Sequence, residues 1–231
     1  MKKITINLLV LLFLSATIFS CGNSNSTNKT DEENIDNNEE ANNEENTESN
    51  EDDFNMFEHY ATILTKTDLI AQFGEANLTD KIESYAEGTV EKNTTTLKNP
   101  ENGYIIKYVW DDDNQTTSWI EASYNIFDAE YNIIGTQKVK TKNGLSTGMS
   151  LADLREWNGA NFKFSGFGWD YGGGIYAEEG SKIANSPVKM SLDMLNYEGT
   201  EFALGDVELN ADDQKLKDAN IIISTITMYI E

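Results

Sequence analysis

Alternating apolar and polar positions predict most of the strands in this chain. Residues 104–110 are aromatic and β-branched, and residues 118–127 alternate strictly. The polar stretch between these segments predicts a hairpin, and residues 131–141 continue the pattern as a third strand. Alternation places four apolar side chains of the second segment on one face: Ile120, Ala122, Tyr124 and Ile126.

Three later segments carry the same signal. Residues 162–164 read Phe-Lys-Phe, and apolar residues fill every second position of residues 188–194. Residues 221–230 are rich in aliphatic side chains on both faces, which is typical of a strand in the middle of a sheet. We therefore expect many antiparallel strands.

Two ten-residue segments, 65–74 and 150–159, share one helical pattern. Each opens with a hydroxyl residue, carries an acid three positions later and ends on glycine. The hydroxyl and the acid are typical of a helix start, and glycine adopts the left-handed conformation that ends a helix. The sequence thus predicts an α+β fold, mainly an antiparallel sheet with two or three short helices on one face.

The spacing of these two segments raises the question of an internal repeat. Their starts lie 85 residues apart, which suits two tandem helix-sheet units at residues 54–141 and 142–231. A capped short helix is common, so a chance likeness is the alternative. Residues 54–231 are long enough for one ordinary domain or two small ones.

The N-terminus has a different composition. Lys2 and Lys3 precede an apolar run over residues 4–19, and Ser20 and Cys21 follow. This order is typical of a secretory signal peptide over residues 1–20. A free thiol in a transmembrane anchor is the alternative, but a spanning helix needs about 20 apolar residues and this run is shorter.

The four residues that end this run, Ile18-Phe19-Ser20-Cys21, resemble the lipobox of bacterial lipoproteins. Phe19 is bulkier than the small residue usual at its position. The resemblance implies that Cys21 becomes the N-terminus and carries acyl chains such as palmitate. It implies attachment in the cell envelope, at the outer membrane, on its periplasmic or surface face. More than one chain makes such attachment durable.

Residues 21–53 contain the lipid-bearing cysteine and a strongly polar tail. From residue 22 onward the tail holds 12 acidic residues, ten asparagines and one lysine. So few apolar side chains cannot offset the entropy of ordering the chain, so we expect a disordered acidic spacer. The alternative interpretations are a sorting signal and a cation trap.

The overall charge limits the classes of partner. The formal net charge is −23, which opposes nucleic-acid binding. Once Cys21 is acylated, the chain has no thiol for a disulfide or a nucleophile. It also contains no phosphate-binding glycine loop and no dinucleotide fingerprint, and we expect no cofactor. The single histidine, His59, is interpreted as structural.

A second resemblance concerns the later helix segment. Gly148-Met149-Ser150, followed by Leu154 and Gly159, is similar to the start of the SmpA/OmlA lipoprotein family. In that family a turn of this kind opens a helix, and an antiparallel sheet follows. Tandem copies of such a unit resemble the beta-lactamase inhibitor protein fold. The resemblance implies architecture only, because the first segment lacks the Gly-Met pair.

Two segments are candidates for binding chemistry. Asp111 and Asp113 lie in a loop rich in oxygen ligands, which calcium prefers, but Gln115 and Thr116 break the EF-hand spacing and favour a solvated hairpin turn. Trp169, Asp170 and Tyr171 precede three glycines, and aromatics beside an acid can stack on sugars or anchor a protein. Aromatics packed in the core beside a tight turn are the alternative for the second segment.

These observations lead to three functional hypotheses. The first is a membrane-anchored, non-enzymatic binding module of the envelope whose partner is a protein or a glycan. The second is an envelope inhibitor or assembly factor, which the tandem units suggest. The third, and weakest, is a carboxylate-dependent glycoside hydrolase, for which the many acids single out no pair.

Overall fold

The computed structural model describes residues 54–114 and 116–230. The predicted signal peptide (1–20), Cys21 and the acidic spacer (21–53) lie outside this part, so the lipid attachment stays a prediction. The described residues belong to one compact unit.

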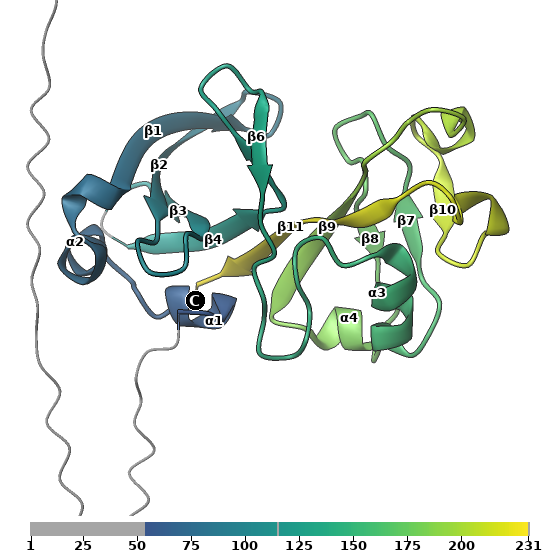
Figure 1. The fold of residues 1–231 in the computed structure, drawn as a ribbon, viewed down its shortest axis with the longest axis horizontal. Helices are drawn as coiled ribbons and strands as arrows, with labels where there is room; N and C mark the ends of the chain where they lie inside the picture. The colour runs from purple at the N-terminus through teal and green to yellow at the C-terminus, as the bar shows by residue number, and fades with distance from the viewer. Residues whose placement is uncertain (1–53, 115, 231) are drawn as a thin grey trace, which may run out of the picture. The chain divides into compact units, whose positions relative to one another are not determined.

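A six-stranded antiparallel sheet is the main element of the fold (Figure 1). Its strand order is β1-β2-β3-β4-β11-β9, so the last strand of the chain lies in the sheet interior. The predicted central position of residues 221–230 is therefore confirmed. The bounds are β1 (Leu78–Tyr85), β2 (Val90–Lys98), β3 (Ile105–Trp110), β4 (Thr117–Ser123), β9 (Val188–Met194) and β11 (Ile221–Tyr229).

Two smaller sheets accompany it, and four short helices complete the regular structure of the described residues. The α+β class with mainly antiparallel pairing is confirmed. The small strands are β5 (Asn125–Phe127), β6 (Ile133–Thr136), β7 (Lys163–Ser165), β8 (Ile175–Tyr176) and β10 (Glu208–Asn210). The helices are α1 (Phe57–Tyr60), α2 (Lys66–Phe73), α3 (Leu151–Asn158) and α4 (Lys182–Asn185), with 3-10 turns η1 (Glu75–Asn77), η2 (Glu201–Ala203) and η3 (Gln214–Leu216).

Both predicted helix segments form as expected. The Thr65 hydroxyl accepts a bond from the Asp68 N–H at 3.2 Å, and the Ser150 hydroxyl accepts one from the Asp153 N–H at 3.1 Å. Gly159 ends α3 in the left-handed region. Gly74 ends α2 with a positive φ of 79° but an extended ψ of 142°, and the 3-10 turn η1 follows before β1 begins.

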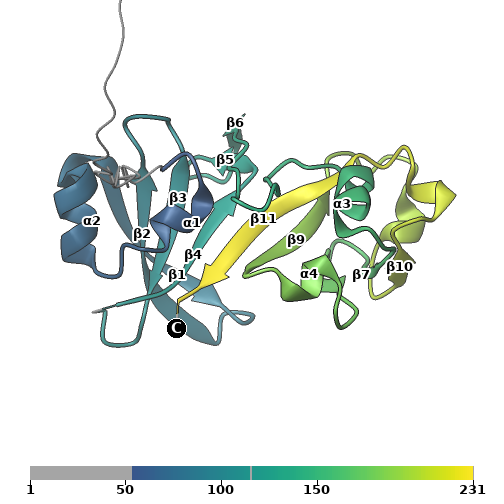
Figure 2. The ribbon, with the colours of Figure 1, turned by 90° about the horizontal axis from the view of Figure 1, so that it is seen from below.

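The helices α1 and α2 cover one face of the sheet, where the apolar core lies (Figure 2). The Tyr108 hydroxyl of β3 donates to the Tyr60 carbonyl of α1 at 3.0 Å, and Asn99 donates to the Tyr60 hydroxyl at 2.7 Å. Leu69 and Phe73 of α2 are buried in the same core. Burial raises the pKa of Tyr60 and, more strongly, of Tyr108.

The predicted third strand over residues 131–141 is wrong in its pairing. Only Ile133–Thr136 is a strand, and it pairs with β5 in a separate two-stranded sheet. The Tyr124 N–H bonds to the Ser224 carbonyl at 2.7 Å, and this bond marks the point where the chain leaves the main sheet. The one-face pattern of residues 118–127 accordingly holds for buried Ile120 and Ala122 and stops there.

Candidate binding groove

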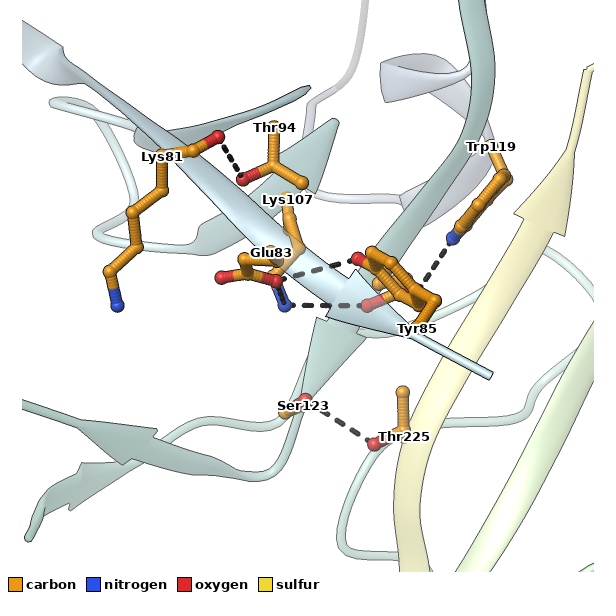
Figure 3. A network of polar contacts seen from close by, with 9 residues as sticks. Lys81, Glu83, Tyr85, Thr94, Lys107, Trp119, Ser123 and Thr225 are labelled. Atoms are coloured by element: carbon orange, nitrogen blue, oxygen red, sulfur yellow. Dashed lines mark hydrogen bonds and ion pairs between the residues drawn. The ribbon is translucent and has the colours of Figure 1, made fainter. Parts of the chain in front are cut away.

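The sheet face opposite the helices carries a charged cluster. In β3, Lys107 lies opposite Glu121 of β4, and it also reaches Glu83 on the outer strand β1 (Figure 3). The Lys107 ammonium lies 2.6 Å from a Glu83 oxygen and 3.6 Å from a Glu121 oxygen. These three side chains are half-buried, and the strands β1, β3 and β4 hold them together.

Aromatic side chains extend this cluster along the same face. The Trp119 indole N–H donates to Glu121 at 2.6 Å, and the Tyr85 ring packs edge-on against Trp119 with centroids 5.4 Å apart. The Tyr85 hydroxyl donates to Glu83 at 3.4 Å. Burial raises the pKa of Tyr85 strongly, and the charges of Glu121 and Glu83 raise it further. Tyr85 therefore stays a neutral donor in this network.

The hairpin β5–β6 turns this face into a groove. Gln137, which follows the hairpin, fixes its base: its side chain accepts from the Ile105 N–H at 2.8 Å and donates to the carbonyls of Ile105 and Ser123 at 2.9 Å each. The space between the hairpin and the sheet has a volume of about 380 Å³. Its walls combine charged groups of the sheet with aromatic groups of the hairpin: Lys81, Glu83, Lys107, Glu121, Phe127 and Tyr131.

The hairpin wall is apolar and open to solvent. Phe127 is 49% exposed and Tyr131 is 77% exposed. The Lys81 ammonium lies 5.4 Å from the centre of the Tyr131 ring, which is within cation–π range. Concave sites of this kind, with apolar walls and a few fixed polar groups, are typical binding sites.

The sequence candidates Trp169, Asp170 and Tyr171 lie elsewhere, in the turn between β7 and β8. The Trp169 ring is partly buried, and its indole N–H donates to the Gly166 carbonyl at 2.9 Å. Tyr171 is 66% exposed and packs edge-on against Trp169 with centroids 5.3 Å apart. The alternative of core packing holds for Phe162 and Phe164, which are buried. Trp169–Tyr171 thus stays a second candidate surface.

The glycines after this turn meet another segment of the same chain. The Gly173 carbonyl accepts from the Leu192 N–H of β9 at 3.0 Å, and Gly174 forms a bridge with Ser191. A Cβ on Gly173 would lie 1.9 Å from the Leu192 carbonyl oxygen. The close approach that the glycine run permits is therefore used by β9.

The loop that holds Asp111 and Asp113 closes the hairpin between β3 and β4. Asp111 accepts a bond from the Thr116 hydroxyl at 2.9 Å, and Asp112 forms an ion pair with Lys92. Within residues 54–114 and 116–230, no three His, Cys, Asp or Glu side chains gather as a metal site would require. The proposed calcium site at Asp111 and Asp113 stays a prediction with no further support.

His59 lies beside Phe54, with ring centroids 6.4 Å apart. Its Nδ1 atom is buried and has no hydrogen-bond partner in the described part of the chain. The contact with Phe54 fits the structural role expected for this residue.

Sequence reasoning did not find the groove. Lys107 and Glu121 lie in predicted strands, but Glu83 and Lys81 lie in β1, a strand that the pattern did not reveal. In residues 78–85 both aliphatic residues, Leu78 and Ile82, are even-numbered and no odd-numbered residue is aliphatic, which was a signal that could have marked a strand with a polar face.

Comparison with known protein families, with curated proteins and with solved structures found no match for this chain. Among the described residues, 54–114 and 116–230, no helix is long and apolar enough to cross a bilayer.

Proposed function

We propose that this chain is a membrane-anchored, non-enzymatic binding module of the cell envelope, and that its partner binds the groove between the sheet and the β5–β6 hairpin. The observation that carries the proposal is the groove itself. Solvent-exposed aromatic side chains of the hairpin lie across from the charged groups of the sheet, and the space between them has a volume of about 380 Å³. The lipobox-like N-terminus supports the anchored location.

The polar floor of the groove supports binding because it is already ordered. Glu83 and Glu121 are both held by Lys107, and Tyr85 and Trp119 donate to the two carboxylates. A ligand that enters finds these groups in place, so little conformational entropy is lost on binding. The hairpin can supply apolar contact area through Phe127 and Tyr131, since aromatic residues often provide most of the binding energy at interfaces.

The same pair of acids bears on the hydrolase alternative. An inverting or retaining glycosidase places its two carboxyl groups on either side of the scissile bond. Here both carboxylates contact one ammonium, so the three groups form a charge-compensated cluster. This arrangement favours a binding floor over a catalytic pair.

Two matched tyrosine variants of the full chain test the proposal. The full chain is immobilised and exposed to a solubilised envelope fraction and to purified envelope glycans. Tyr131→Ser removes a groove wall, whereas Tyr171→Ser removes the exposed ring of the second candidate surface. Both rings are largely exposed, so neither change should disturb folding.

We expect Tyr131→Ser to weaken capture about tenfold or more, as loss of an aromatic anchor does, and Tyr171→Ser to leave it unchanged. The reverse pattern would move the site to residues 169–171. Equal capture by both variants and the unchanged protein would contradict both sites.

A further inference from the structure

The outer strand β1 has backbone groups that no described residue uses. Directly after β2, the Asn99 N–H bonds to the Tyr104 carbonyl, so the odd-numbered residues of β2 turn their backbone groups toward β3. The even-numbered residues of β2 turn their backbone groups toward β1. In the pairing of β1 with β2, the even-numbered Thr94 lies opposite Lys81. It follows that Asp80, Ile82 and Ser84 turn their N–H and C=O groups to the free edge, whereas the N–H of Leu78, at the start of the strand, bonds to the Glu75 carbonyl.

Side chains at this edge combine an exposed apolar residue with two opposite charges. Ile82 is 66% exposed and lies on the helix-covered face, at a hollow of about 440 Å³ beside α2. Its neighbours Lys81 and Glu83 project on the groove face, one on each side of it. Charged residues on an edge strand normally discourage pairing with other strands. Such charges favour pairing only in a register that places a positive residue of one strand opposite a negative residue of the other.

We propose that β1 pairs with β1 of a second copy of this chain, antiparallel, with a two-fold axis at Ile82. In this register the Ile82 residues of the two copies lie directly opposite each other. Because the backbone N–H and C=O of Ile82 point to the free edge, the two residues form a hydrogen-bonded pair. Each Lys81 lies opposite the second copy's Glu83, which Lys107 of its own copy also contacts. The two main sheets become one sheet of twice the width, and two exposed isoleucines are buried.

Charge selects this register among the symmetric ones whose axis lies at residues 80–83. Moving the axis to Lys81 places two lysines opposite each other, and moving it to Glu83 or Asp80 opposes two carboxylates. Like charges directly opposite each other destabilise a strand pair, whereas opposite charges stabilise it. The axis at Ile82 leaves the uncharged Ser84 opposite Asp80. The net charge of −23 repels the copies at long range, but physiological salt screens this beyond about 8 Å.

Disulfide trapping in the full chain tests the register. Cys21→Ser removes the native cysteine, so that no thiol remains even in chains that are not acylated, and Ile82→Cys then places one thiol at the proposed axis. Opposed residues of a hydrogen-bonded antiparallel pair have Cα atoms about 5.5 Å apart, which a disulfide can bridge. Ile134→Cys, in β6, is the matched control, because Ile134 is 65% exposed and lies outside β1.

Under mild oxidation in detergent we expect the Ile82→Cys chain to form at least about fivefold more covalent dimer than the Ile134→Cys chain. Adding Lys81→Glu should reduce this dimer about fivefold or more, because the introduced carboxylate then opposes that of Glu83 twice per dimer. Adding Lys81→Met should reduce it less. Equal dimer from both cysteine positions, or no effect of Lys81→Glu, would overturn the proposal.

The outcome is separate from that of the groove. Ile82 does not line the groove, so a monomeric chain that still captures its partner would remove only this inference. The proposal is also overturned if no covalent dimer forms. That result is expected if β1 pairs instead with another segment of its own chain. Circular dichroism of each variant shows that the fold is intact.

Discussion

At the scale of single residues, Gly173 shows that a sequence can indicate a close contact without indicating which residue makes it. Three consecutive glycines permit a close backbone approach, and the structure shows that β9 makes this approach. Gly173 has φ of 72°, and its N–H points at the carbonyls of Ser165 and Gly166. The sequence could indicate that a side chain is excluded here. It could not indicate that Leu192, nearly twenty residues later, is the excluding group.

We expect Gly173→Ala to destabilise the protein by about 3 kcal/mol or more, because the new methyl collides with backbone that cannot move away and the positive φ is strained. Gly180→Ala is the control: Gly180 also has a positive φ, of 83°, but faces open space. It should cost only about 1 kcal/mol. Urea unfolding followed by circular dichroism measures both. Equal losses would show that collision with β9 is unimportant.

At the scale of elements, most strands with alternating apolar side chains were predicted, residues 131–141 being the exception, and the strands without this alternation were missed. The strands β3, β4, β9 and β11 and the capped helices α2 and α3 follow from their patterns. By contrast, β1 and β2 contain mostly threonine and charged residues, because one strand is an edge and much of their surface faces water. Their pairing comes from the hairpin and from long-range contacts, which local pattern does not report.

One such contact joins α2 to β1 and gives a pH dependence. Lys66 lies 2.5 Å from Asp80, and the Thr95 hydroxyl donates to the same carboxylate at 2.6 Å. These bonds hold the pKa of Asp80 below its ordinary value of 3.8. A lowered pKa contributes stability above the ordinary value, and this stability is lost as pH falls through the lowered one.

We therefore expect Asp80→Asn to destabilise the protein near neutral pH, and the difference from the unchanged protein to shrink as pH falls below the ordinary carboxyl pKa of 3.8. The pair is largely exposed, so the loss should stay below about 1 kcal/mol. Urea midpoints measured from pH 7 down to about pH 3 test this. Lys66→Met should give a similar loss at neutral pH. A difference that persists at low pH would assign the effect to packing.

At the scale of the whole described fold, the main sheet joins the early and late parts of the chain. Strands β1–β4 come from residues 78–123, whereas β9 and β11 come from residues 188–229, and β11 pairs with β4 over five residues (Figure 1). The groove lies wholly within the early part of the chain, where β1, β2, β3, β4 and the hairpin after β4 meet. Neither the sheet order nor the groove could be read from local periodicity, since both depend on which distant strands meet.

This arrangement predicts how the protein unfolds. Leu69 of α2 and Leu154 of α3 are both fully buried, one in each of the expected sub-units 54–141 and 142–231. Each Leu→Ala change should cost about 2–5 kcal/mol. Because β11 pairs with β4 on one side and β9 on the other, loss of structure in either part removes pairing from the other. We expect one cooperative transition in urea, shifted by either substitution, with tryptophan fluorescence and circular dichroism coincident. Two separable transitions, each shifted by only one substitution, would show instead that the two sub-units fold independently.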